Sequence, residues 1–210
     1  MKVPQPDYTA AREQLHLVSE WLLAGPQYAT SHTIRLEAGG GAIATVADPA
    51  VSITAAGLTF NGATTPLRGT VTGLGAMVGL PCERPDVEYH DTVPGDIDAP
   101  LNAPPEAYQA VLAVYDIAAE AMDSFCDETP ILWPEHFDLA LRKTDVNFGV
   151  SPGDASSPEP YAYVGPDSFD SNPFWNAPFG AALTIDPDDS DAAAKVLAFF
   201  ETGRDLTQGA

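Results

Sequence analysis

Two runs of alternating apolar and polar residues, joined by a short turn, constrain the fold of this chain most. The first covers residues 136–142, in which Phe137, Leu139 and Leu141 are the apolar positions. The alternation resumes over 146–150, after Lys143-Thr144-Asp145. Successive side chains of a strand point to opposite faces of a sheet, so the pattern predicts a half-buried antiparallel hairpin. Further strands are expected over 160–164 and 179–185.

The clearest helix is expected over 105–127. Pro104-Pro105 suits a helix start, and apolar residues from Tyr108 to Cys126 recur at helical spacing opposite an acidic stripe. A first helix is expected over 7–24, stopped by Gly25-Pro26, and a last one from a Ser190 cap through Gly203. Short strands are expected over 33–36, 42–46 and 51–54, and glycines weaken a helical pattern over 67–78.

These elements predict a single α+β domain over residues 1–210. Its mostly antiparallel sheet is covered by the long central helix and two terminal helices. A chain of 210 residues is long enough to bury a substantial core. Residues 81–105 are Pro-rich and acidic and keep no period, so we expect a loop or lid there.

The charge balance excludes several classes of partner. The chain has 9 basic and 30 acidic residues, a net charge of −21, which repels nucleic acid and anionic lipid. It has no apolar run of 18 residues and no apolar signal core near Met1, so we expect a soluble cytoplasmic protein. Cys82 and Cys126 are the only cysteines and form no metal-thiolate motif.

A candidate site begins at Trp133-Pro134-Glu135-His136-Phe137-Asp138. On a strand His136 and Asp138 point the same way, and a carboxylate can orient a histidine that acts as general base or metal ligand. The neighbouring strand and loops add polar and aromatic groups of the kind that line small-ligand sites. The predicted catalytic residues are His136, Asp138, Glu159 and Tyr161, and the predicted ligand-binding residues are Asp154 and Trp175.

The first helix offers a second polar set. Glu13, His16 and Glu20 are spaced by three and four residues and share one side of a helix. If that helix packs over the sheet, His16 and Glu20 complete a metal set with His136 and Asp138, suited to a divalent transition metal. The alternative is a non-catalytic binding or scaffold protein, such as a homodimer, whose polar face is solvated or lies in an interface.

Several blocks resemble an uncharacterised family from high-GC Gram-positive (actinobacterial) bacteria. They are Trp133–Ala140 (WPEHFDLA), Gly149–Asp154 (GVSPGD), Pro158–Pro166 (PEPYxYVGP) and Phe174-Trp175-Asn176. Leu15-His16 with Glu20 is similar to that family too. The resemblance implies a cytoplasmic bacterial protein and places the candidate histidines and carboxylates in recurrent blocks, and it carries no assigned activity. The ligand, the reaction and the oligomeric state therefore stay open.

Overall fold

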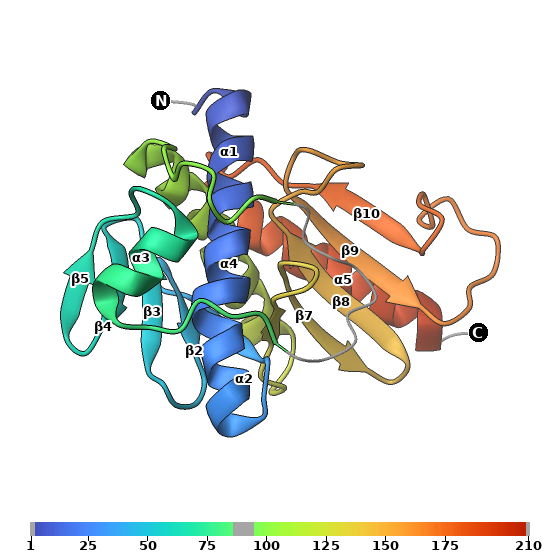
Figure 1. The fold of residues 1–210 in the computed structure, drawn as a ribbon. Coiled ribbons are helices and arrows are strands. Elements are labelled where there is room, and N and C mark those ends of the chain that lie inside the picture. Colours follow the sequence, from blue (N-terminus) through green and yellow to red (C-terminus); the bar gives the residue numbers. More distant parts are fainter. Residues whose placement is uncertain (1–2, 86–94, 209–210) are drawn as a thin grey trace.

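The computed structural model of the chain describes residues 3–85 and 95–208 (Figure 1). Its first half is a helical segment followed by five strands and a short helix. These elements are α1 (Gln5–Val18), the π-helix η1 (Ser19–Ala24), α2 (Gly25–Ser31), β1 (Leu36–Gly39), β2 (Ala42–Thr45), β3 (Val51–Thr54), β4 (Gly57–Phe60), β5 (Ala63–Thr65) and α3 (Val71–Val78).

The second half repeats this order of helix, five strands and helix. Its elements are α4 (Pro105–Phe125), β6 (Ile131–Trp133), β7 (Asp138–Lys143), β8 (Val146–Ser151), β9 (Tyr161–Pro166), β10 (Ala181–Thr184) and α5 (Ala192–Gln208). The long central helix is therefore confirmed, and so is the run of strands that follows it.

All ten described strands form one antiparallel sheet in the order β10-β9-β8-β7-β6-β1-β2-β3-β4-β5. The prediction of an α+β fold with an antiparallel sheet is confirmed. Each half is a meander of neighbouring strands, and the two halves meet where β1 pairs with β6. The register at that junction is a single residue pair, Leu36 opposite Leu132.

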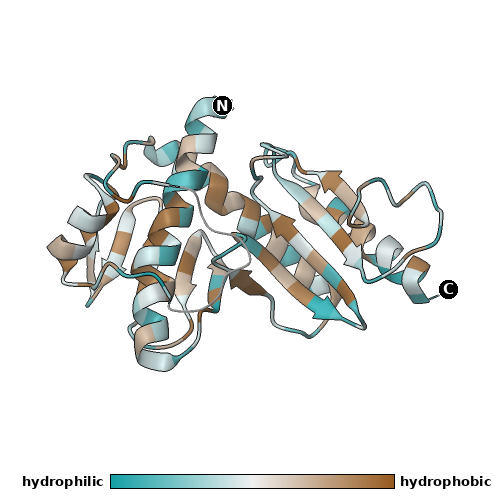
Figure 2. Cartoon of the chain, turned by 45° about the vertical axis from the view of Figure 1, so that its right-hand side comes forward, coloured by the Kyte–Doolittle hydropathy of each residue, from teal (hydrophilic) through white to brown (hydrophobic). Residues whose placement is uncertain are grey.

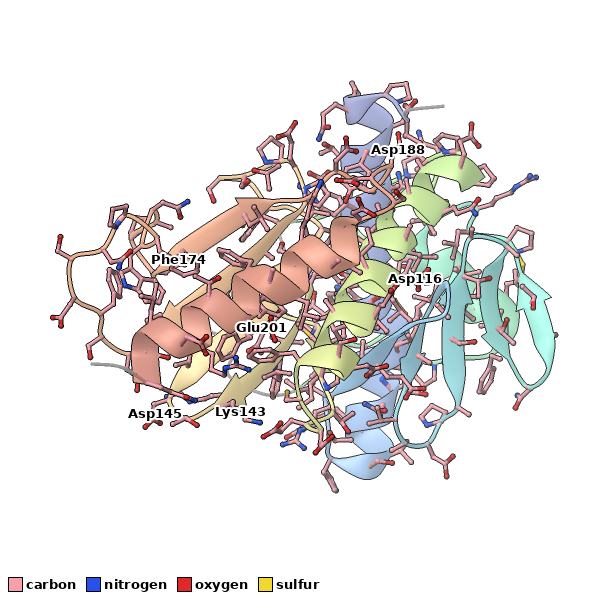
Figure 3. The ribbon with its side chains drawn as sticks, turned by 180° about the vertical axis from the view of Figure 1, so that it is seen from behind. Asp116, Lys143, Asp145, Phe174, Asp188 and Glu201 are labelled. Carbon is pink, nitrogen blue, oxygen red and sulfur yellow. The ribbon has the colours of Figure 1, made fainter. Side chains whose placement is uncertain are left out.

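The second half of the sheet has one apolar and one polar face. Residues paired across antiparallel strands share a face, and the register sets Leu139 opposite Val150 and Val150 opposite Ala162, all of them buried. Helices α4 and α5 cover this apolar face, as the view from behind shows (Figure 3). Figure 2 shows the matching alternation of apolar and polar bands along these strands.

Helix α1 lies on the other side of the second half. In Figure 1 it crosses in front of the junction between the two halves, whereas α5 lies behind β8 and β9. It packs against α4, where Tyr108 of α4 donates a hydrogen bond to Gln14, and it continues into η1, which packs on β2 and β3. Helix α1 therefore borders the face of β7–β9 that α4 and α5 leave uncovered.

The prediction that Gly25-Pro26 stops the first helix is wrong. The π-helix η1 joins directly to α2, and Pro26 occupies the first turn of α2, where a missing N–H is tolerated. Position 25 requires a glycine because the backbone at Glu83 approaches it closely. A Cβ there would lie 1.7 Å from the carbonyl oxygen of Glu83.

Other boundaries also differ from expectation. The first strand is β1 (Leu36–Gly39), later than predicted, and β4 and β5 extend the meander beyond the predicted strands. Strand β7 begins at Asp138, because Phe137 takes a left-handed φ of 55° that ends the turn before it. His136 therefore lies on a turn and not on the strand.

The predicted lid is described only at its two ends. Residues 86–94 lie outside the described residues, so the lid hypothesis stays a prediction. On the near side, Glu83 N–H donates to Trp21 O over 3.2 Å, and on the far side Leu101 N–H donates to Gly69 O over 2.7 Å. Both ends are thus bound to the first half. Within 3–85 and 95–208, no helix is long and apolar enough to cross a membrane.

Candidate functional site

A cleft of about 1030 Å³ lies on the polar face of β7–β9. The strands form its floor, α1 and the turn before β7 form one wall, and the loop after β8 closes one end. Its principal lining residues are Arg12, Glu13, His16, Glu135, His136, Asp138, Ser151, Asp154, Tyr161, Tyr163, Asp167 and Phe179. A second hollow of about 700 Å³ continues along β6 and β7 and shares Glu135, His136, Asp138 and Tyr163.

Asp138 is the most buried carboxyl in the floor, with 7% of its surface exposed. Tyr163 donates its hydroxyl hydrogen to Asp138 Oδ2 from two strands away. This reach depends on Gly149 of β8, which pairs with Tyr163 on one side and on the other with Ala140, two residues along β7 from Asp138. A Cβ at Gly149 would come within 2.3 Å of the Tyr163 ring, so the ring lies flat over the glycine.

The second oxygen of Asp138 is buried and has no hydrogen-bond partner in the described part of the chain. Burial raises the pKa of Asp138, and the Tyr163 hydrogen bond and the nearby His136 partly offset this rise. Glu135 raises the pKa further, and the buried Tyr115 also lies within electrostatic range. A buried polar atom is rarely left unpaired, which marks this carboxyl as unusual.

Replacing Gly149 with Ala should displace the Tyr163 ring. Gly149 has an ordinary φ, so Ala fits the backbone and the clash with the ring is the only cost. We expect a loss of about 1–3 kcal/mol in unfolding free energy, measured by urea denaturation. The same substitution in a Tyr163→Ala background should cost less. An equal loss in both backgrounds would contradict the ring-over-glycine arrangement.

Replacing Asp138 with Asn should change how stability depends on pH. As pH rises above about 3.9, Asp138 ionises first in the unfolded chain, because its pKa in the folded protein is raised. The wild type should therefore lose stability relative to Asp138→Asn as the pH rises from about 4 to the folded-state pKa. Urea denaturation from pH 4 to 8 measures this difference. A pH-independent difference would show that the carboxyl is not destabilised by burial.

His16 connects α1 to the turn that precedes β7. Its ring stacks on Phe137, with the centroids 4.6 Å apart, and its Nε2 lies 2.6 Å from Pro134 O. Burial is the main cause that lowers the pKa of His16 to about 4. The ring is therefore neutral near pH 7, and the carbonyl partner places its single proton on Nε2.

Phe137 anchors the contact between His16 and this turn. It is buried, its ring also meets Tyr115 edge-on, and its carbonyl oxygen accepts the Tyr115 hydroxyl hydrogen over 2.8 Å. A left-handed φ is strained for a phenylalanine, and these contacts hold it there. The turn thus fixes the start of β7, and with it the position of Asp138.

His136 is the more exposed histidine of the cleft, with 45% of its side chain accessible. Its Nε2 lies 3.6 Å from Glu135 Oε1, and both residues line the cleft and the second hollow. His136 and Asp138 both line the cleft, although His136 reaches it from the turn and not from the strand. The catalytic roles assigned to them stay predictions.

The loop after β8 is organised around Asp154. One carboxylate oxygen accepts hydrogen bonds from Ser156 and Ser157, and the other accepts the Tyr161 hydroxyl hydrogen over 2.7 Å. Burial raises the pKa of Asp154, but these hydrogen bonds outweigh it and hold the pKa below its usual range. Burial and Asp154 together raise the pKa of Tyr161. Both predicted residues therefore lie in the cleft, already bonded to one another.

Three predicted residues lie away from the cleft. Glu159 is exposed and does not line it. Trp175 packs against Phe169 and Phe174. Phe174, which is labelled in Figure 3, in turn contacts Phe199 of α5. Glu20 is buried and forms an ion pair with Arg84, 2.6 Å from its Nε. The sequence pattern cannot distinguish a cleft wall from an aromatic cluster under a helix.

The predicted metal set is not assembled. Within the part of the chain that the structure describes, no group of three or more His, Cys, Asp and Glu side chains is arranged to hold a metal ion. His16 uses Nε2 for Pro134, and Glu20 is paired with Arg84. The transition-metal hypothesis stays a prediction, and the described residues offer no assembled set of metal ligands for it.

Sequence reasoning missed Arg12 and Gly149 as parts of the site, and it noted Glu13 in a polar set without giving it a role. Glu13 shares a helix side with His16, which was a usable signal. Gly149 inside a strand pattern signals a close approach, here by the Tyr163 ring. Arg12 gave no signal, because its side chain is buried against the loop after β8, where Nη1 donates to Asp154 O.

Comparison with protein-family models, curated proteins and solved structures gives no match for this chain. The fold and the cleft thus define its class as an α+β protein with a polar cleft on an open sheet face.

Proposed function

We propose that this protein binds a small polar molecule in the cleft over β7–β9. The observation that carries the proposal is Asp138, a buried carboxyl in the cleft floor with one oxygen that lacks a partner among the residues that the structure describes. Such an arrangement costs stability, and a binding partner that satisfies the oxygen offsets the cost.

The shape and the polarity of the cleft support this proposal. Its volume is at the upper end of the range for small-molecule sites, and a few polar groups converge beside the Tyr161, Tyr163 and Phe179 rings. The rigid position of Tyr163 over Gly149 means that one wall is formed before a ligand arrives. Preformed walls lower the ordering cost of binding.

Chemical-shift mapping tests the proposal. A set of cationic, neutral and anionic fragments is titrated into the ¹⁵N-labelled protein, and the perturbed amides are assigned. We expect hits that perturb residues 135–138, 151–154 and 161–163, with affinity at least about tenfold weaker in Gly149→Ala, whose displaced ring enters the cleft. A Tyr28→Phe variant serves as the control that leaves the cleft intact.

A fragment set that perturbs only residues outside the cleft contradicts the proposal. So does a cleft that binds no fragment while the protein forms a concentration-dependent homodimer through the same face. That result favours the scaffold alternative, and sedimentation of the wild type over a range of concentrations detects it.

A further inference from the structure

The cleft is strongly acidic. Among residues 3–85 and 95–208, its lining has five carboxylates against one guanidinium: Glu13, Glu135, Asp138, Asp154 and Asp167, with Arg12. Of these carboxylates, Asp167 is paired with Arg142 of the second hollow over 3.0 Å. The guanidinium of Arg12 is engaged, because Nη1 donates to Asp154 O over 3.3 Å and Nη2 lies 3.6 Å from Glu13 Oε1. Four carboxylates remain against the engaged Arg12, so an anion would meet net repulsion here.

Aromatic rings stand beside these carboxylates. Tyr161 and Tyr163 lie with their centroids 6.4 Å apart, and Tyr163 meets Phe179 edge-on at 6.3 Å. Ring faces carry partial negative charge and attract ammonium groups. The wall is therefore suited to a cation that also has an apolar body.

The unpaired oxygen of Asp138 is an independent observation. It belongs to a side chain that is more than nine-tenths buried and that lines the cleft, and it lacks a hydrogen-bond donor in 3–85 and 95–208. Asp138 Oδ2 already has the Tyr163 hydroxyl, so the missing partner is a donor to Oδ1. An ammonium group supplies both a donor and a positive charge.

We infer that the ligand of this cleft is an organic ammonium ion with a small apolar body, bound through Asp138 and the Tyr163 ring. The inference rests on the proposed function and names its ligand class. A neutral alcohol offers a donor but leaves the carboxylate uncompensated, and a carboxylate ligand adds repulsion.

Three probes of nearly equal size and different charge test this inference. They are benzylammonium, benzyl alcohol and benzoate, titrated by calorimetry at two salt concentrations. We expect benzylammonium to bind at least about tenfold more tightly than the other two. Asp138→Asn should weaken its binding about tenfold or more, and Glu135→Gln should weaken it a few-fold, as a second variant outside the floor.

Asp123→Asn is the matched control. Asp123 is exposed on α4, which covers the opposite face of the sheet, and its replacement removes the same unit of charge. Its effect on benzylammonium affinity should stay below about twofold. An equal loss in Asp123→Asn and Asp138→Asn would mean non-specific attraction to an acidic protein and would overturn the inference.

The outcomes separate the inference from the proposed function. Preferential binding of benzyl alcohol or benzoate at the cleft overturns the ammonium ligand and leaves small-molecule binding standing. If benzylammonium does not bind while other fragments bind in the cleft, the ammonium ligand is likewise overturned and small-molecule binding stands. Failure of every fragment at the cleft overturns both.

Discussion

Replacing Phe200 with Ala is expected to lower the free energy of unfolding by about 3–5 kcal/mol. Phe200 of α5 is fully buried, and its ring lies 5.6 Å from both Phe125 of α4 and Phe148 of β8, measured between centroids. Three elements therefore meet at one ring, and deletion leaves a cavity that none of them can close alone. Urea denaturation followed by far-UV circular dichroism measures the loss.

Phe169→Ala is the control for this prediction. Phe169 is 41% exposed and contacts Trp175 at the surface, so its removal should cost less than about 1 kcal/mol. A Phe200→Ala loss as small as that of Phe169→Ala would contradict the packing of α4 and α5 on the sheet.

Replacing Arg84 with Met is expected to cost about 3–5 kcal/mol at neutral pH. Glu20 has 1% of its surface exposed, and its Oε1 lies 2.6 Å from Arg84 Nε. Burial raises the pKa of Glu20, and Arg84 partly offsets the rise. Without the guanidinium a buried carboxylate is left uncompensated, which is costly.

The sign of the pH dependence gives this prediction a second test. In Arg84→Met the pKa of Glu20 should rise further, so the deficit should shrink as the pH falls and the carboxyl takes up a proton. The double variant Glu20→Gln/Arg84→Met removes the charge and should recover most of the loss at neutral pH. A deficit that is constant with pH, or that persists in the double variant, would assign the cost to lost packing of the Arg84 side chain.

The elements whose apolar residues repeat with a clear period could be predicted from the sequence. Helix α4 and strands β7 and β8 lie close to their expected ranges, because their apolar positions repeat at the spacing of one structure only. The short strands of the first half were harder to place. They are three or four residues long, and such segments are defined by pairing with neighbours more than by their own pattern.

The helix through Gly25-Pro26 was missed for a physical reason. Both residues usually end a helix, yet here the glycine admits the Glu83 carbonyl and the proline lies in a first turn. The contact that explains them comes from a segment almost 60 residues away, which local reasoning cannot see.

The candidate site was predicted as a set of residue types and not as a geometry. His136, Asp138, Asp154 and Tyr161 line one cleft, as their blocks suggested. Their actual partners depend on the strand register, which places Gly149 under the Tyr163 ring. The contact of His16 with Phe137 depends on α1 crossing the junction of the two halves, which no single segment specifies.

The single residue pair between β1 and β6 has a mechanical consequence. A force that pulls the two five-stranded halves apart meets little backbone hydrogen bonding at Leu36 and Leu132. The load passes to the side chains between α1 and α4 and between α4 and β1, which also join the two halves. Under tension the two halves should therefore separate before either five-stranded meander unfolds. The cleft floor on β7–β9 would stay intact, and α1, which forms one wall of the cleft, would move away from it.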